Sequence, residues 1–128
     1  DEEPELIRVL TSHEIRVWKA LSGESAVVKN QAQQFCDAGA EAILLDARQT
    51  AGNEIVYGGT GHLTDWNLAR GLSSQTRLIL AGGLGPENVR DAVEAVKPWM
   101  VDGVSKLEAQ KGRKDAAKVR DFVRNAKF

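Results

Sequence analysis

The feature that most constrains this chain is a repeat of short apolar runs separated by segments with helical spacing. The runs are rich in Ile, Leu and Val and lie at 15–21, 42–45, 78–81 and 99–104. The middle two are continuously hydrophobic, which is typical of strands that are buried on both faces. Alternation of strands with helices predicts a parallel sheet with right-handed crossovers and helices packed outside it.

The segments between the runs predict helices with recognisable ends. Pro86 and Glu87 open the clearest one, because proline suits the first turn of a helix. Asp115 is placed to cap the last helix, and Gly39 is placed to end an earlier one. In chain order the expected helices are one around Pro4 to Leu10, then 25–38, a shorter one over 66–72, the one opening at Pro86, and a last one over 115–126.

The strand count predicts an incomplete closed sheet. A barrel of parallel strands needs about eight strands and typically ~250 residues, whereas this chain has 128 residues. We therefore expect fold class α/β, as half of a (β/α)₈ TIM barrel over residues 1–128. The chain begins with Asp1 rather than Met, which fits a piece of something longer. On its own, such a piece leaves the runs at 15–21 and 99–104 as unpaired edges.

Composition narrows the class of protein further. Seventeen basic and eighteen acidic residues give a net charge of -1 without long blocks of one sign, so we expect no nucleic-acid or lipid surface. No apolar run approaches the ~20 residues that span a bilayer. Cys36 is the sole cysteine, which excludes an intrachain disulfide and a multi-cysteine metal site. We expect a soluble, cytoplasmic protein, with Cys36 as a small core residue rather than a nucleophile.

The residues that follow each strand carry the expected chemistry. In parallel α/β folds, ligands collect at the carboxyl ends of the strands. Gly82 and Gly83 follow one strand, and Gly103 and Ser105 follow the next, so that bare main-chain N–H groups could hold a phosphate. Taken alone, the glycines could equally relieve crowding at a turn. Another long connection, over 47–64, holds four glycines and has the length of a functional loop.

Two acidic residues complete the predicted site. Asp46 follows Leu45, and Asp102 follows Val101 near the end of the last apolar run. Partial burial and a nearby phosphate dianion would both favour the protonated form of Asp46, which could then act as a general acid. The alternative for each is a loop-capping aspartate.

Three motifs in this order resemble the phosphoribosylanthranilate isomerase family of tryptophan biosynthesis. They are Ala42-Ile43-Leu44-Leu45-Asp46, then Gly58-Gly59-Thr60-Gly61 with Asp65-Trp66-Asn67, then Leu80-Ala81-Gly82-Gly83-Leu84-Gly85-Pro86-Glu87-Asn88-Val89. The later Val101-Asp102, Ser105, Glu108, Gly112-Arg113-Lys114-Asp115 and the segment 122–127 continue the likeness, which is greatest to fungal enzymes in this closing segment.

The resemblance implies strands five to eight and helices four to eight of the barrel, the C-terminal half of the domain. It implies an Amadori rearrangement of N-(5-phosphoribosyl)anthranilate to 1-(2-carboxyphenylamino)-1-deoxyribulose 5-phosphate, without cofactor or metal. Asp46 would protonate the ribose ring oxygen and Asp102 would contact the substrate. Main-chain amides near Gly82, Gly83, Gly103 and Ser105 would hold the phosphate.

The resemblance also implies that part of the enzyme lies elsewhere. The family's general base is a cysteine on the first strand, which is absent here, and Cys36 does not match it. A fragment of this kind would be inactive without its missing N-terminal half-barrel, and the family's domain is often fused to other tryptophan-pathway enzymes. Residues 103–107 read Gly-Val-Ser-Lys-Leu where the family usually has Val-Ser-Ser-Gly-Val.

Two alternatives remain open from the sequence. One is a half-barrel that assembles with itself and binds phosphorylated ligands without catalysis. The other is a different phosphate-binding barrel enzyme, against which the Gly-Gly-Thr-Gly loop and the Asp65-Trp66 pair argue.

Overall fold

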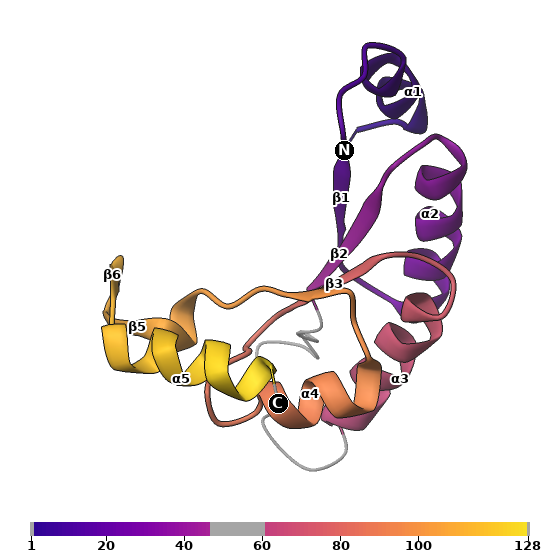
Figure 1. Ribbon diagram of the computed structural model, residues 1–128. Coiled ribbons are helices and arrows are strands. Elements are labelled where there is room, and N and C mark those ends of the chain that lie inside the picture. The colour runs from indigo at the N-terminus through magenta and orange to yellow at the C-terminus, as the bar shows by residue number, and fades with distance from the viewer. Residues whose placement is uncertain (1, 47–60, 128) are drawn as a thin grey trace.

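The computed structural model describes residues 2–46 and 61–127 of the chain, which form an α/β fold. Strands and helices alternate along most of its length (Figure 1). In chain order the elements are α1 Pro4–Ser12, β1 Trp18–Leu21, α2 Ser25–Asp37, β2 Ala42–Asp46, α3 Gly61–Ser73, β3 Leu78–Ala81, α4 Val89–Val96, β4 Met100–Val101, the short 3₁₀ helix η1 Ser105–Leu107, β5 Glu108–Gln110, β6 Arg113–Lys114 and α5 Ala116–Ala126.

The main sheet pairs neighbouring strands in chain order. Within the described residues its order is β1-β2-β3-β4, and every pairing is parallel. Helices α2, α3 and α4 follow one another along one side of the sheet, while no described helix covers the opposite, concave side (Figure 1). All four strands therefore end at the same edge of the sheet, as the alternating pattern predicted.

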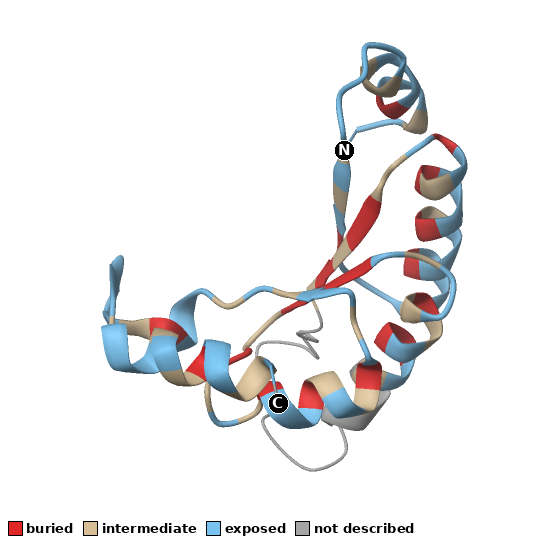
Figure 2. Cartoon of the chain, viewed as in Figure 1, coloured by how far each residue is buried: buried red, intermediate tan, exposed pale blue. Residues whose placement is uncertain are grey.

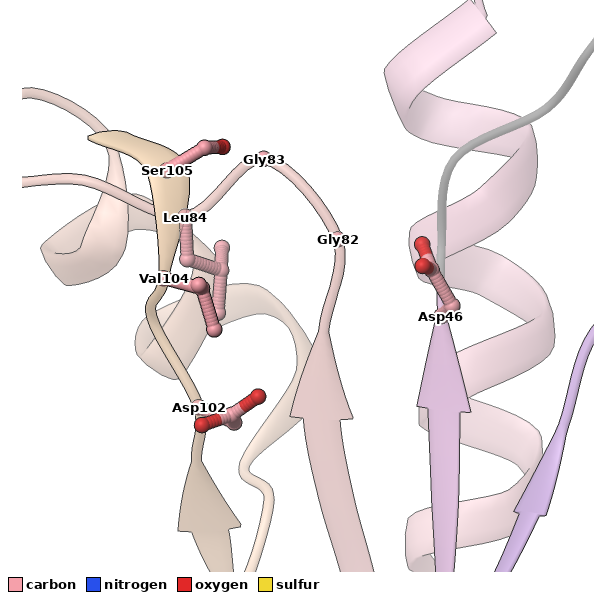
Figure 3. A pocket seen from close by; sticks show the side chains of 7 residues that line it. All are labelled: Asp46, Gly82, Gly83, Leu84, Asp102, Val104 and Ser105. Atoms are coloured by element: carbon pink, nitrogen blue, oxygen red, sulfur yellow. The ribbon is translucent and has the colours of Figure 1, made fainter. Parts of the chain in front are cut away.

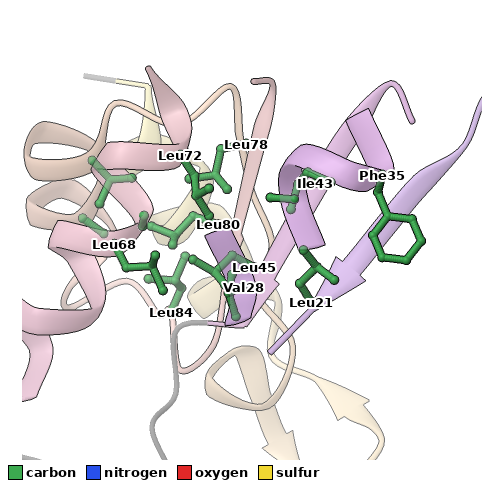
Figure 4. Packing of buried hydrophobic residues seen from close by; sticks show 14 of the residues in the cluster. Leu21, Val28, Phe35, Ile43, Leu45, Leu68, Leu72, Leu78, Leu80 and Leu84 are labelled. Carbon is green, nitrogen blue, oxygen red and sulfur yellow. The ribbon is translucent and has the colours of Figure 1, made fainter. Parts of the chain in front are cut away.

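The core lies between the sheet and its helices. Strand β3 is buried along its whole length, with Leu78 and Leu80 both 0% exposed. Val28 and Phe35 of α2 pack with the strand residues (Figure 4), and Val89 of α4 belongs to the same buried cluster. The outer sides of the helices are exposed (Figure 2). In β2 and β3, residues on both faces of the sheet are buried, which explains the continuous hydrophobic runs.

Side chains next to the amino-terminal ends of the strands join the two outer strands. Trp18 begins β1 and Trp99 immediately precedes β4, yet their rings meet edge to face with centroids 6.0 Å apart. Glu41 accepts hydrogen bonds from Trp18 Nε1 at 3.2 Å, Arg16 Nε at 2.9 Å and Arg77 Nη1 at 2.9 Å. The guanidinium of Arg77 lies 5.4 Å from the Trp99 ring centre. The sheet is therefore curved enough for side chains at its two edge strands to be in contact.

Several helix ends match the sequence prediction. The carboxylate of Asp115 accepts N–H groups from Ala117 and Lys118 and caps α5, and these bonds lower the pKa of Asp115. Gly39 has φ +104° just after α2, a conformation that suits glycine. No helix in the described part of the chain is long and apolar enough to cross a membrane.

Other boundaries differ from the prediction. Helix α4 begins at Val89 rather than Pro86, because residues 86–88 form a turn. The outer strands β1 and β4 are shorter than their apolar runs, since each pairs on one side only. The antiparallel pair β5 and β6 was not predicted, because its residues are polar and mostly exposed and carry no alternating pattern. Helix α3 starts at Gly61, within the expected long loop, and the remainder of that loop, 47–60, lies outside the described residues.

Truncation of the central strand tests the core. We expect Leu80→Ala to lower the free energy of unfolding by about 2–5 kcal/mol, because it leaves a cavity between sheet and helices. Val27→Ala on α2, where the side chain is 51% exposed, is the matched control and should change stability by no more than ~0.5 kcal/mol. Urea unfolding measures both. Equal losses in the two variants would contradict the packing described here.

Glu41 gives a prediction of how stability depends on pH. The hydrogen bond from Arg16, helped by Trp18 and Arg77, holds the pKa of Glu41 below its ordinary value of 4.5. A lowered pKa contributes stability above that ordinary value and loses it as pH falls through the folded-state value. Glu41→Gln should therefore be less stable than the unchanged chain at pH 7, and the difference should shrink as the pH falls below the ordinary value of 4.5. Urea midpoints of both proteins are measured across this pH range, with Glu94→Gln on α4 as control. A difference in midpoint that stays constant with pH would refute the prediction.

Candidate functional site

A cavity opens at the edge where the parallel strands end. It encloses about 240 Å³, which is below the ~300 Å³ at which pockets for drug-sized ligands begin, so it suits one end of a ligand. Its walls come from the ends of β2, β3 and β4 and from the loops that follow β3 and β4 (Figure 3). The lining residues are Asp46, Gly82, Gly83, Leu84, Asp102, Val104 and Ser105.

Asp46 is the last residue of β2 and stands beside the glycine loop. In the parallel register its partner is Ala81, the residue directly before Gly82. The side chain is half-buried, and in Figure 3 its carboxylate points from the strand end toward the same opening as Gly82. The partial burial expected for Asp46 is confirmed. The register, rather than a loop, fixes the carboxylate at the rim.

The first glycine loop adopts a backbone that other residues rarely take. Gly82 has φ +95° and Gly83 has φ +70°. A Cβ added to Gly83 would meet nothing within 4 Å, so crowding does not explain that glycine. The positive φ does, because it turns the chain sharply at the strand end and exposes peptide groups at the cavity wall. Of the two readings of Gly83 left open by the sequence, relief of crowding is therefore the weaker.

The second loop brings Asp102, Val104 and Ser105 to the opposite wall. Asp102 donates its N–H to Leu80 O at 2.8 Å, which continues the β3–β4 ladder and aims the following loop at the cavity. Figure 3 shows the Asp102 carboxylate at the end of β4, turned toward β3. Lys114 Nζ supports this loop from outside by donating to Val104 O at 2.7 Å.

Lys114 also anchors the neighbouring hairpin. Its ammonium lies 3.1 Å from Glu108 Oε1, and that hydrogen bond is the main reason why the pKa of Glu108 lies below its ordinary value. The basic segment 111–114 therefore includes a residue that holds the second loop in shape.

Gly103 has a different place from the one expected. It is not among the residues that line the cavity. A Cβ added there would lie 3.0 Å from Phe122 Cζ and 3.1 Å from Leu107 Cδ1. These contacts are tighter than ordinary packing allows, so the absence of a side chain lets α5 pack against the loop. A direct phosphate contact from Gly103 stays a prediction, and its observed contacts are with the core.

Sequence reasoning missed two residues of the cavity wall. Leu84 and Val104 line it, although attention to glycines and acids passed over them. Only their position could have indicated them, because each lies in a loop that was already predicted to form the site. Cys36 is elsewhere: it packs against the core, and its Sγ lies 3.3 Å from Thr76 Oγ1, so the prediction of a core residue is confirmed. Among the described residues, no group of His, Cys, Asp and Glu is arranged to hold a metal ion.

A curved parallel sheet, outer helices and a cavity at the carboxyl ends of the strands define an α/β protein of the kind found in (β/α)₈ barrels. The chain belongs to the N-(5'-phosphoribosyl)anthranilate isomerase family, whose sequence profile matches residues 1–125.

Individual relatives agree with this assignment. The N-(5'-phosphoribosyl)anthranilate isomerase of Trichlorobacter lovleyi is 41% identical over 128 residues, covering 99% of this chain and 58% of the relative. The enzyme of Rubrobacter xylanophilus is 39% identical, with coverage of 99% and 59%. This chain therefore spans little more than half the length of these relatives. Both are bacterial and lend no support to the expected likeness to fungal enzymes.

Solved structures give the same picture. Phosphoribosyl anthranilate isomerase from Thermotoga maritima superposes with a TM-score of 0.77 at 34% identity, covering 99% of this chain and 58% of that one. A phosphoribosyl anthranilate isomerase in complex with reduced 1-(o-carboxyphenylamino)-1-deoxyribulose 5-phosphate superposes with a TM-score of 0.75 at 33% identity, with coverage of 99% and 56%.

Two glycines that both have open space around them separate backbone strain from crowding. We expect Gly83→Ala to lower the free energy of unfolding by about 1–2 kcal/mol, because alanine must adopt φ +70°. Gly71→Ala, within helix α3 and with no atom near the added Cβ, should instead raise it by up to ~1 kcal/mol. Thermal or urea unfolding measures whether each variant is less or more stable than the unchanged chain. A gain in stability for Gly83→Ala would contradict the strained turn.

Proposed function

We propose that this chain supplies strands five to eight and helices four to eight of a phosphoribosylanthranilate isomerase barrel. In this proposal it carries the general acid and the phosphate site of the enzyme. The observation that carries the proposal is the convergence of Asp46, the Gly82–Gly83 turn and the Ser105 loop on one cavity at the carboxyl ends of the strands. Family membership and the share of the relatives' length that the chain spans both support it.

Curvature of the sheet supports the half-barrel part of the proposal. Neighbouring strands lie ~4.8 Å apart, so the outer strands of a flat sheet of this order would be separated by roughly 14 Å. Contact between Trp18 of β1 and Trp99, the residue before β4, fits a sheet that bends toward closure. Side chains of β2 alternate between the two faces of the sheet, and Leu44 and Asp46, which share one face, are only partly buried.

The exposed edges suit a second half-barrel. Ile15, Trp99 and Met100 are 48%, 45% and 39% exposed, although they belong to the apolar runs of the outer strands. Unpaired strand edges with apolar side chains favour pairing with further strands. The partner we propose is the amino-terminal part of the family's barrel, whether on another chain or on the same polypeptide.

The proposed chemistry needs an acid near a fixed sugar phosphate. Isomerisation begins when the ribose ring oxygen takes up a proton as its bond to the anomeric carbon breaks, and Asp46 would deliver that proton. Main-chain N–H groups of the two loops would hold the phosphate, which keeps the ring at a constant distance from Asp46. Asp102, on the opposite wall, would contact the substrate.

A base is also required to remove the proton from the neighbouring carbon, and this chain offers no suitable cysteine for it. Cys36 packs against the core beside Thr76, away from the cavity. The base would therefore come from the amino-terminal half, so we expect the chain alone to be inactive. No cofactor enters the proposed mechanism. A cytoplasmic setting and fusion to other tryptophan-pathway domains are also part of this proposal.

A self-assembling, non-catalytic module is the second candidate, because the same exposed edges could pair between copies. Sedimentation distinguishes the two. A tight homodimer that excludes the amino-terminal half of a relative would favour the module. A monomer or weak assembly that gains order when that half is added would favour the enzyme.

Replacement of the acid tests the enzymatic proposal. The chain is combined with the amino-terminal part of the Trichlorobacter lovleyi relative, and conversion of N-(5-phosphoribosyl)anthranilate is followed by chromatography. Asp46→Asn should lower turnover about 100-fold or more, because the amide cannot donate an acidic proton to the ring oxygen. Asp91→Asn on the exposed side of α4 is the matched control and should leave turnover unchanged.

Two results would count against the proposal. Near-normal turnover of the Asp46→Asn assembly, with normal circular dichroism, would remove Asp46 from the acid role. Absence of isomerase activity in an assembly that sediments as a closed one-to-one complex would remove the activity itself.

A further inference from the structure

Asn88 stands at a helix start but does not act there as a cap. It is the N-cap residue of α4, a position where an asparagine side chain usually accepts an N–H from the first turn. No such bond forms here. The side chain turns back instead: Oδ1 accepts the N–H of Gly85 at 2.9 Å, and Nδ2 donates to the carbonyl of Gly83 at 3.1 Å.

We propose that Asn88 is a positioning residue that sets the peptide of Gly83 and Leu84 for anion binding. The inference rests on the proposed phosphate site and adds to it the residue that shapes its first loop. Asn88 does not line the cavity, so it acts through the loop rather than on the ligand.

The bond from Asn88 to the Gly83 carbonyl fixes the orientation of the whole Gly83–Leu84 peptide. In a trans peptide the carbonyl and the following N–H point in opposite directions. Because Nδ2 of Asn88 holds the Gly83 carbonyl, the N–H of Leu84 points away from Asn88. Both Gly83 and Leu84 line the cavity. Within the described residues, neither N–H donates to a main-chain carbonyl, which leaves both available to an anion.

The carboxamide is the group that this geometry requires. The two hydrogen bonds that join Asn88 to Gly83 and Gly85 are called the clamp below. Gly85 presents a donor and Gly83 an acceptor, so the clamp needs an oxygen and an N–H on one short, planar group. Aspartate would offer a second acceptor to the Gly83 carbonyl, and serine is too small to bridge both peptides. The main chain closes the same turn, since Asn88 donates its own N–H to Gly85 O at 3.2 Å.

The clamped loop is also tied to the rest of the site wall. Asn125 of α5 donates Nδ2 to Pro86 O at 2.7 Å, between the clamp and the helix. Lys106 Nζ lies 3.8 Å from Glu87 Oε1 and so links this loop to the second one. Asn125 therefore offers a matched comparison, because its side chain bonds to Pro86 of the same loop, whereas the bonds to Gly83 and Gly85 come from Asn88.

The test uses the full chain and inorganic phosphate. Binding is titrated by ¹⁵N–¹H NMR, in which the amides of Gly83 and Leu84 report on the site, and stability is followed by urea unfolding. We expect Asn88→Ala to weaken phosphate affinity about 10-fold, since two hydrogen bonds that order the loop are lost. Asn125→Ala should lose stability by a similar amount but keep its affinity within about 2-fold.

Asn88→Ser separates positioning from capping. Serine is a good N-cap, so helix α4 should keep its stability, while the hold on the Gly83 carbonyl is lost. We expect phosphate affinity close to that of Asn88→Ala together with a urea midpoint close to that of the unchanged chain. That combination would support positioning, because a purely structural role would move both values together.

The unfavourable outcomes are distinct. If the unchanged chain binds phosphate at Gly83 and Leu84 and Asn88→Ser binds it equally well, the positioning role is wrong while the proposed function stands. If phosphate shifts neither amide in the unchanged chain, the anion site itself is wrong and the inference falls with it.

Discussion

The parallel pairing of β2 with β3 is the constraint on which the rest of the molecule depends. These strands are buried between helices and neighbouring strands, and their register sets Asp46 beside Ala81. Because the strands run in the same direction, the carboxylate and the Gly82–Gly83 turn reach one edge together. An antiparallel arrangement would put Asp46 at the opposite edge of the sheet from the glycines. A shift of one residue would send its side chain to the other face.

The two ends of the sheet serve different purposes. At the amino-terminal end, Glu41 accepts hydrogen bonds from Trp18 and Arg77, and the Trp18 ring contacts the Trp99 ring. At the carboxyl end, glycines and short loops leave peptide groups and carboxylates around a cavity. Packing and ion pairs at one end and an open, polar cavity at the other match the division of roles that is typical of barrel folds.

The sequence predicted the parts of this structure that depend on local pattern. Continuous apolar runs gave β2 and β3, and Asp115 gave the start of α5, because two-sided burial and capping leave residue-level signals. The β5–β6 hairpin and the packing role of Gly103 could not be read in the same way. The hairpin is mostly exposed and has no alternating pattern, and the role of Gly103 depends on Phe122, which is distant in the sequence.

The behaviour of Asn88 shows why a correct local rule can still miss function. An asparagine before a helix predicts a cap, and the residue does occupy the cap position. Its side chain is used by the preceding turn instead, which forgoes a helix contact in order to orient two peptides at the cavity wall. Local rules of this kind are most often set aside where a site requires it. The departure from capping is therefore itself an argument that the shape of the glycine loop matters to what the cavity binds.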